Sequence, residues 1–457
     1  MIAVKEAPKM DTQEKLTRAQ KPSADAMKLH PFYRGKIETV PKACIRSLDD
    51  FAIWYTPGVA APCRAIVKQP DLVYEYTNKW NTIAIVSDGT RVLGLGDIGP
   101  KAGLPVMEGK ALLFKWLGGV DAVPIMLDTK DPDEIIHTVL MLQPAFGGVN
   151  LEDIAQPKCF RVLDTLREKA EIPIWHDDQQ GTACVTLAGL INALRIVHKP
   201  IGEVRIVFVG SGAANVAISR LCFKAGADPA RCMVVDSHGI LHNKRQDIFL
   251  RRAEYVDKWR LCQMTNAAGR QGGIAEALAD ADVCIALSQP GPGTIRPEWI
   301  SQMAPDAIVF ACANPTPEIW PWDAASAGAR IVATGRSDFA NQVNNSLGFT
   351  GIFRGALDVR AKTITDEMCI SAAEALEAAA PDDGLNPECI LPTMIEWEVY
   401  AREAMAVGLK AQEQGLARVR LSADALFGQA SEMILRARRL TEMMMETGLI
   451  AEPPEEG

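Results

Sequence analysis

The stretch Val204–Asn215, VRIVFVGSGAAN, decides the fold class of this 457-residue chain. The apolar run over 204–209 predicts a buried strand, and a helix is predicted to follow the two glycines. Gly210 permits a tight turn, and Gly212 lets the backbone approach a pyrophosphate at the helix N-terminus. In this strand–turn–helix context the pattern favours a dinucleotide-binding unit over a glycine turn in an α/β domain that binds no nucleotide.

The residues that follow bear on which dinucleotide is bound. Asn215 stands where the glycine pattern usually ends in Gly or Ala, so its larger side chain must be accommodated between helix and strand. The next predicted strand, 232–235, ends in Asp236, which can accept a hydrogen bond from the ribose 2′-hydroxyl of NAD and would repel the 2′-phosphate of NADP. Lys244 and Arg245 are alternative ligands for that phosphate. The sequence therefore favours NAD without settling the choice.

The strand and helix pattern continues toward the C-terminus. Three further apolar runs are each followed by a polar loop: 283–286, 307–310 and 331–333. Successive strands of this kind predict a parallel sheet whose loops share one crevice at the carboxyl ends of the strands. Beyond Asp358, spaced apolar residues and caps predict three helices: Thr365–Ala379, Pro392–Gln414 and Ser422–Gly448.

A second informative stretch, 151–183, carries two pairs of acidic residues: Glu152 with Asp153, and Asp177 with Asp178. The second pair closes the apolar run 172–175 and precedes a small-residue helix. Carboxylates at the carboxyl end of a strand lie where α/β proteins usually place chemistry. Three or four converging carboxylate oxygens would suit Mg²⁺ or Mn²⁺. Taken alone, however, such pairs are more often ordinary caps and turn residues.

The N-terminal third contains a predicted hairpin and a predicted helix. Ile83–Val86 and Arg91–Leu95 flank the turn Asp88-Gly89, which predicts two antiparallel strands. A helix is predicted from Met107, with Lys110 in its first turn. The positive end of the helix dipole and burial near a divalent cation would both lower the pKa of Lys110, as a general base requires. The alternative is that Lys110 points into solvent.

Tyr55 is followed by Thr-Pro-Gly, which predicts an irregular turn after a helix that begins near Ser47. That turn would hold the Tyr55 ring toward a cleft, unless the ring simply packs beside Trp54 in the core.

Composition limits the class of protein. Of the residues, 48% are hydrophobic and 23% are charged. These proportions are typical of a soluble globular enzyme, and the length suggests roughly two to three domains. A net charge of −9 without a basic stripe argues against general nucleic-acid binding. The polar N-terminus resembles neither a signal nor a transit peptide, and no apolar run is long enough to span a bilayer. Eleven scattered cysteines without a C-x-x-C pair predict mostly buried, reduced thiols and a cytoplasmic location.

Eight segments stand in one order along the chain: YTPGVAAPC, DGTRVLGLGDIG, PVMEGKALLFK, NLEDI, HDDQQGTA, GSGAAN, ANPTPE and NQVNN. Together they resemble the malic enzyme family, and most nearly its short prokaryotic type without a phosphotransacetylase-like extension. The resemblance covers residues 34–359. It implies metal-dependent oxidative decarboxylation of (S)-malate to pyruvate and CO₂ with reduction of NAD or NADP, and decarboxylation of oxaloacetate. A malolactic-type enzyme and a catalytically silent nucleotide-binding paralogue are the alternatives.

The resemblance also implies roles for particular residues. Lys110 would be the general base that takes the C2 hydroxyl proton, and Tyr55 the general acid that protonates C3 of enolpyruvate. The implied ligands of Mg²⁺ or Mn²⁺ are Glu152, Asp153 and Asp178, with Asp177 supporting them. Malate would contact Arg91, Lys110, Asn314 and Asn345. The coenzyme would contact Asp178, Gly210, Ser211, Gly212, Ala213, Ala214, Asn215, Asp236 and Asn314.

We therefore expect an α/β fold with a Rossmann-type parallel-sheet coenzyme domain and an α/β substrate domain completed by C-terminal helices. The expected divisions are a mobile N-terminal arm (1–28), a substrate and metal domain (29–198), the coenzyme domain (199–358) and a C-terminal helical region packing on both (359–457). The segment 238–270 is longer and more basic than the family usually needs. The resemblance further implies at least a homodimer, and the methionine-rich helix near Leu440–Met445 is a candidate interface.

Overall fold

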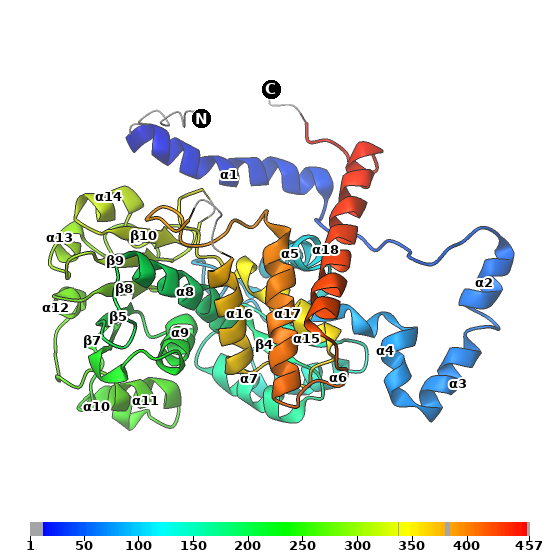
Figure 1. Cartoon of the computed structure of the whole chain (residues 1–457), viewed down its shortest axis with the longest axis horizontal. Coiled ribbons are helices and arrows are strands. Elements are labelled where there is room, and N and C mark those ends of the chain that lie inside the picture. Colours follow the sequence, from blue (N-terminus) through cyan, green and yellow to red (C-terminus); the bar gives the residue numbers. More distant parts are fainter. Residues whose placement is uncertain (1–11, 337, 380–383, 455–457) are drawn as a thin grey trace.

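The computed structural model describes residues 12–336, 338–379 and 384–454 (Figure 1). Two sheets organise this part of the chain. The first has the order β2-β1-β3-β4 and is parallel throughout. Its strands are β1 (Thr82–Ser87), β2 (Asp121–Met126), β3 (Gly148–Leu151) and β4 (Ile174–His176).

The second sheet has the order β10-β9-β8-β5-β6-β7 and is parallel except for the terminal pair β6 and β7. Its strands are β5 (Ile206–Val209), β6 (Met233–Asp236), β7 (Gly239–Ile240), β8 (Val283–Ala286), β9 (Ile308–Ala311) and β10 (Ile331–Thr334). The strand order reverses beside β5, so a crevice opens at the carboxyl ends of β5 and β8. The predicted fold class, with a Rossmann-type parallel sheet, is confirmed.

Helices cover both sheets. Those before β5 are α1 (Thr12–Tyr33), α2 (Leu48–Trp54), α3 (Ala60–Lys68), α4 (Val73–Tyr76), α5 (Gly99–Gly118), α6 (Pro132–Leu142), α7 (Lys158–Lys169) and α8 (Asp177–Ile196). Those after β5 are α9 (Ala213–Lys224), α10 (Gln246–Leu250), α11 (Val256–Met264), α12 (Ile274–Leu278), α13 (Pro297–Ile300), α14 (Pro321–Ser326), α15 (Phe349–Asp358), α16 (Asp366–Ala378), α17 (Trp397–Glu413) and α18 (Ala423–Glu446). The three predicted C-terminal helices are therefore present, with ends shifted by a few residues.

Helix α8 joins the two halves. It begins directly after β4, packs against α9 and α16, and buries most of its residues in a core cluster that contains side chains of both sheets. Its small residues allow this close packing on several sides. Helix α8 consequently fixes the position of the end of the first sheet relative to the glycine turn of the second.

The predicted hairpin at 83–95 is wrong. β1 pairs in parallel with β2 on one side and β3 on the other, so neither edge is free for an antiparallel partner. The turn signal itself is sound, because Gly89 has φ +66°, but the chain then forms only an isolated bridge between Val92 and Gly96. Tertiary pairing has overridden a local preference.

The predicted start of α5 at Met107 is also wrong. The helix begins at Gly99 and contains Pro105, so Lys110 lies in its interior and not in its first turn. The dipole argument for a lowered pKa of Lys110 does not apply there, because the dipole acts within the terminal turns. Gly103 and Pro105 look like helix breakers in the sequence. The buried side chains of Met107, Ala111 and the residues beyond them hold the helix together despite both.

The N-terminal region, where the sequence predicts a mobile arm over residues 1–28, is described only from residue 12. Residues 1–11 lie outside the described part of the chain, and α1 is a helix that runs along the upper side of the molecule (Figure 1). The predicted helix near Ser47 is present as α2, with Ser47 as its N-cap in a capping box with Asp50. In the described residues no helix is both long enough and apolar enough to cross a membrane.

Candidate active site

One cavity of about 710 Å³ brings together most of the side chains singled out in the sequence. Its wall comes from the carboxyl ends of both sheets and from α5, α8 and α9. The predicted site residues that line it are Arg91, Lys110, Glu152, Asp153, Asp178, Gly212, Ala213, Ala214, Asn314 and Asn345. Asn344 lines it as well, whereas Tyr55, Gly210, Ser211, Asn215 and Asp236 do not.

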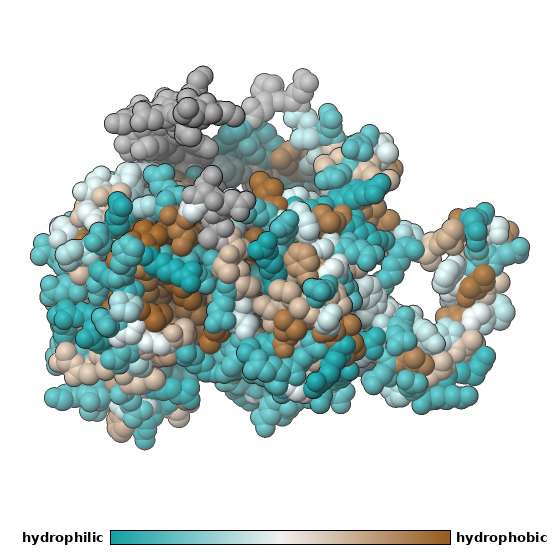
Figure 2. Space-filling view, in the orientation of Figure 1, coloured by the Kyte–Doolittle hydropathy of each residue, from teal (hydrophilic) through white to brown (hydrophobic). Residues whose placement is uncertain are grey.

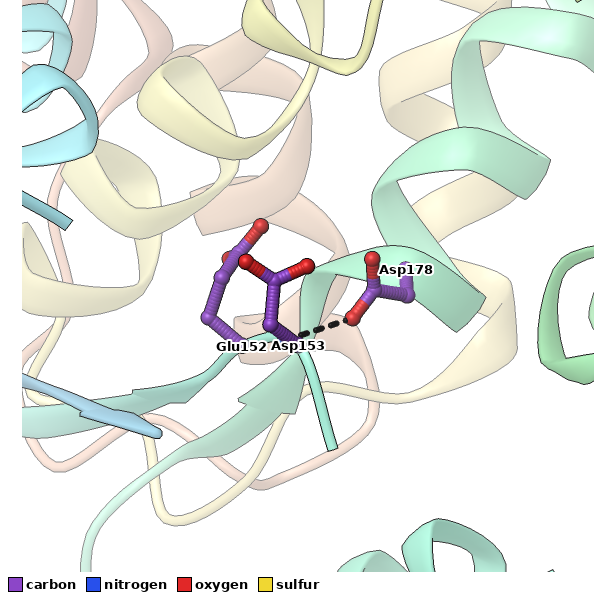
Figure 3. Close-up of side chains that lie close together, drawn as sticks. All are labelled: Glu152, Asp153 and Asp178. Atoms are coloured by element: carbon purple, nitrogen blue, oxygen red, sulfur yellow. Dashed lines mark hydrogen bonds between the residues drawn. The ribbon is translucent and has the colours of Figure 1, made fainter. Parts of the chain in front are cut away.

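Three carboxylates converge at one end of this cavity (Figure 3). Glu152 and Asp153 follow β3, and Asp178 extends toward them from the first turn of α8. Each offers an oxygen, and these oxygens lie within 4.8 Å of one another. The backbone N–H of Asp153 donates to Asp178 Oδ2 at 2.9 Å, which ties the two segments together. Asp153 has φ +54°, a conformation that aspartate tolerates better than most residues.

The electrostatics of this cluster suit a hard divalent cation. Burial, and then the charge of Asp178, raise the pKa of Asp153 to about 8. Burial also raises the pKa of Glu152, although Lys110 opposes the shift. Asp153 Oδ2 is buried and accepts no hydrogen bond from the described residues. A bound Mg²⁺ or Mn²⁺ would offset the repulsion among these carboxylates and satisfy that oxygen, so the residues present fit such an ion.

Lys110 is buried beside the carboxylate cluster. Its Nζ lies 3.1 Å from Glu152 Oε1, donates to Asp177 Oδ2, and stands 4.0 Å from the centre of the Phe349 ring. Burial alone would lower the pKa of Lys110, but the two carboxylates outweigh it and raise that pKa above its usual value. The prediction of a lowered pKa therefore does not hold for this arrangement of charges, although the alternative of a solvent-exposed Lys110 is excluded.

The members of the second acidic pair have different partners. Asp177 is fully buried, and it accepts from Lys110 and, at 3.0 Å, from Trp175 Nε1. Asp178 has a side chain that is 33% exposed and faces the cavity, with His176 Nε2 at 3.2 Å from its Oδ2. Burial opposes the charge of Asp178, but His176 and Lys110 lower its pKa below the usual value. Asp177 thus lies outside the cluster of three converging carboxylates and contacts Lys110 instead.

Gly181 explains how Asp177 reaches Lys110. A Cβ at position 181 would lie 1.9 Å from Asp177 Oδ1, so only glycine leaves room for this carboxylate to fold back over the helix.

Contacts within the protein fix the conformation of the glycine turn after β5. Gly210 has φ +104°, and a Cβ there would lie 2.6 Å from the carbonyl oxygen of Leu287. The Asn215 side chain is buried and donates to the carbonyl oxygens of Val209 and Gly210 at 2.9 and 3.0 Å. Asn215, which departs from the usual glycine pattern, therefore links the turn to helix α9 through these two hydrogen bonds.

Gly212 differs from Gly210, because a Cβ there would meet no protein atom within 4 Å. The free space lies on the cavity side, at the N-terminus of α9, where a pyrophosphate would approach. The residues of the turn therefore fit a dinucleotide.

The side chain of Asp236, at the end of β6, is almost fully buried because basic side chains surround it. It accepts from both terminal nitrogens of Arg245 at 3.0 and 3.1 Å, from the backbone of His238 at 2.8 Å, and from Lys258 Nζ at 2.6 Å. Burial opposes its charge, but Arg245 and Lys258 hold the pKa of Asp236 below the usual range. Lys258 belongs to α11, so the basic segment 238–270 supplies two of the partners of this carboxylate.

Sequence reasoning missed several residues that support the site. His176 stands beside Asp178, Trp175 orients Asp177, and Asn150 donates to Glu152 Oε2 at 2.7 Å. All three lie on β3 or β4 within two residues of the acidic pairs, and that proximity was an available signal. Phe349, which contacts Lys110, had no such signal, because it is far from Lys110 and from the acidic pairs in the sequence.

Comparison with known proteins agrees with this geometry. The family model described as malic enzyme, N-terminal domain, matches residues 34–167, and the one described as malic enzyme, NAD binding domain, matches 179–412. A bifunctional malic/malolactic enzyme of Bacillus subtilis is 45% identical over 91% of this chain and 98% of its own length. An NAD-dependent malic enzyme of Geobacillus stearothermophilus is 48% identical over 84% of this chain and 78% of its own.

Solved structures resemble the chain as well. The crystal structure of Entamoeba histolytica malic enzyme is 48% identical and covers 98% of this chain and 93% of its own, with a TM-score of 0.95. The structure of malic enzyme from Pyrococcus horikoshii is 49% identical and covers 90% of this chain and 95% of its own, with a TM-score of 0.86.

Proposed function

The chain belongs to the malic enzyme family, and we propose that it catalyses the oxidative decarboxylation of (S)-malate to pyruvate and CO₂ with reduction of NAD or NADP. One observation carries the proposal. A buried lysine, three converging carboxylates and an open glycine turn line one cavity, which is what this reaction needs. We further propose that residues 29–198 supply the substrate and metal side of the site and residues 199–358 the coenzyme side, in a cytoplasmic enzyme whose cysteines are mostly buried.

The cavity offers complementary groups to malate. The guanidinium of Arg91 would bind a malate carboxylate, and the amides of Asn314 and Asn345 would hold substrate and nicotinamide. Lys110 would take the proton of the C2 hydroxyl while the C2 hydride leaves for the coenzyme. A divalent cation bound by Glu152, Asp153 and Asp178 would supply Lewis-acid polarisation of the C2 oxygen. Water must be kept from the reacting carbon, and burial of Lys110 and Asp177 serves that end.

The ion pairs of Lys110 govern its protonation. Only the neutral amine can accept a proton, and Glu152 and Asp177 favour the ammonium. Positive charge gained near Glu152 would weaken that preference and move the pKa of Lys110 down toward the working pH. Asp177, still in contact with Nζ, can then share the proton that Lys110 takes.

NAD is the coenzyme we propose, because Asp236 ends β6 where an adenosine ribose is usually recognised, and its negative charge opposes a 2′-phosphate. Relatives of this chain are named as NAD-dependent and as NADP-dependent enzymes, so family membership alone does not choose between them.

The test is a spectrophotometric assay of reduced coenzyme with malate and Mn²⁺, run with NAD and with NADP. We expect turnover that requires both malate and the metal, and that Lys110→Ala loses while coenzyme still binds. Coenzyme binding without turnover of any C4 hydroxy acid would refute the proposal and favour a silent paralogue. Product analysis distinguishes pyruvate from lactate, which the name of the Bacillus subtilis relative makes a specific alternative.

A further inference from the structure

Hydrophilic residues cover most of the face of the molecule seen in Figure 2, as expected because a charged side chain is costly to bury. Glu318, which lies between β9 and α14, is an exception, since none of its surface is exposed. No lysine or arginine of the described residues forms an ion pair with it. A buried acid without a counter-ion costs stability, so the groups that it does contact are informative.

The Glu318 carboxylate joins two loops that follow neighbouring strands. Its Oε1 accepts from the backbone N–H of Ser288 at 2.8 Å, and its Oε2 accepts from the backbone N–H of Ala313 at 3.1 Å. Ser288 follows β8, and Ala313 follows β9. Burial raises the pKa of Glu318, and the backbone donors of Ser288 and Ala313 oppose that shift because they favour the carboxylate. Each carboxylate oxygen is thus bound to a different loop.

The backbone around Glu318 holds the loop after β8 as well. The carbonyl oxygen of Glu318 accepts from the N–H groups of Gly293 and Ile295, both at 3.2 Å. The carbonyl oxygen of Thr316 accepts from the N–H of Gly291 at 3.2 Å. The loop after β8 is therefore attached at several points to the segment that ends in Glu318.

Both loops form part of the cavity wall. Ser288 and Ala313 line the cavity, as do Pro290 and Asn314, whereas Glu318 does not reach its surface. Glu318 therefore lies behind the wall, where it can hold the wall in place without touching a ligand.

The two loops belong to the half of the second sheet that would face the nicotinamide. A Rossmann sheet consists of two mononucleotide-binding halves, and the dinucleotide lies across the crevice between them. The turn after β5 and the end of β6 serve the adenosine half. Strands β8 and β9 lie on the other side of β5, so the loops that Glu318 joins serve the nicotinamide half.

We propose that Glu318 is a positioning residue that fixes both loops of the nicotinamide side, and with them Asn314, in the arrangement that binds the coenzyme. This inference deepens the proposed function and rests on it for the identity of the ligand. An acid is needed at position 318 because two N–H donors approach it from different loops. Glutamine has the same size, but it offers a single acceptor oxygen, so one of the two N–H groups would face its NH₂ group.

The test compares the binding of NAD with that of ADP-ribose, which lacks the nicotinamide, by isothermal titration calorimetry. Glu318→Gln should weaken NAD binding by at least about tenfold, the loss expected for one hydrogen bond to a charged group. Binding of ADP-ribose should stay close to that of the wild type. A general loss of folded structure would weaken both ligands alike, so the difference between them reports the position of the nicotinamide loops.

The matched control is Asn192→Ala. Asn192 is also buried, and its Nδ2 donates to the carbonyl oxygens of Glu377 and Ile390 at 3.2 and 2.9 Å, away from the cavity. This variant should lower Tm, as Glu318→Gln does, but should keep the wild-type affinity for NAD. If Glu318→Gln does not fold, Glu318→Asp serves instead. Aspartate keeps both acceptor oxygens but is one methylene shorter, so it can hold only one loop and should show the same selective loss.

Wild-type affinity for NAD in the folded Glu318→Gln variant, or equal losses for NAD and ADP-ribose, would overturn the proposal. Because binding is measured without malate, failure of the proposed function is seen separately. A wild type that binds NAD but turns over no malate would refute the function, and a selective loss of NAD binding in Glu318→Gln would still support the role of Glu318. An active wild type whose Glu318→Gln variant binds NAD normally would refute the inference and leave the function supported.

Discussion

The tightest contact in the site gives the sharpest prediction. Gly181→Ala puts a methyl group 1.9 Å from Asp177 Oδ1 and 2.8 Å from its Cγ, so the Asp177 carboxylate must move by more than an ångström. Gly181 is not at a positive φ, so the backbone tolerates alanine and the cost comes from the collision alone. Asp177 is fully buried, and it can move only by loosening its contacts with Lys110 and Trp175.

The magnitude follows from the bonds that Asp177 makes. A hydrogen bond to a charged group contributes about 1.5–3 kcal/mol, and weakening the one to Lys110 by that amount corresponds to about a tenfold to hundredfold loss of kcat. Helix propensity works in the opposite direction, because alanine stabilises a helix interior by about 0.5–1 kcal/mol relative to glycine. We therefore expect a large fall in kcat with a small change in the melting temperature.

The assay compares kcat, KM for malate and coenzyme affinity in Gly181→Ala and in the control Gly428→Ala, a helical glycine on α18 with free space around it. In an Asp177→Ala background, which removes the colliding carboxylate, Gly181→Ala should cost nothing further. A wild-type kcat for Gly181→Ala, or a fall of equal size in both backgrounds, would refute the view that Asp177 positions Lys110.

Three further predictions concern the coenzyme turn, the coenzyme choice and the metal site. Asn215→Ala removes two hydrogen bonds to the turn and should weaken coenzyme binding by about tenfold in a fluorescence titration, while Asn215→Asp, which keeps the size but not the donors, should not restore it. Asp236→Ala leaves Lys258 without its carboxylate and Arg245 with only Asp247, so kcat/KM for NADP should rise relative to NAD; an unchanged ratio would show that Asp236 does not select the coenzyme. Asp153 has a pKa of about 8 in the folded protein, which is above its value in the unfolded chain. Without metal, the protonated Asp153 therefore favours the folded state at low pH, and this contribution to stability is lost as the pH rises toward 8. Melting curves in chelator from pH 5 to pH 8 should therefore fall more steeply for the wild type than for Asp153→Asn, and equal slopes would contradict this.

The sequence predicted the coenzyme-binding half of the fold well, because short apolar runs and glycine turns in a parallel sheet are local signals. The strands at 283–286 and 307–310 and their polar loops needed no knowledge of distant residues. The hairpin after β1 failed for the opposite reason. Whether residues 91–95 could pair with β1 depended on β2 and β3, which come much later in the chain, and the local pattern contains no information about them.

The same limit applies to the candidate site. The sequence singled out Lys110 and the carboxylates, and the cavity contains them, but their protonation depends on partners that only the fold brings together. Lys110 meets Asp177, which is distant in the sequence, and its pKa moves opposite to the predicted direction for that reason. The sequence predicted a Tyr55 ring that faces a cleft or packs in the core, whereas the ring is exposed after α2, a helix that buries none of its residues.

The asymmetry between Asp177 and Asp178 follows from the start of α8. Successive helical residues point about 100° apart, so two adjacent carboxylates cannot face the same group. Because α8 begins at Asp177, directly after β4, one carboxylate is directed inward to Lys110 and the other toward the cavity and Glu152. Both lie in the first turn, where the helix dipole favours negative charge, which helps to offset the cost of placing two anions side by side. A turn between β4 and α8 would have left their directions open. The immediate start of the helix separates the carboxylate that contacts Lys110 from the carboxylate that faces Glu152 and Asp153.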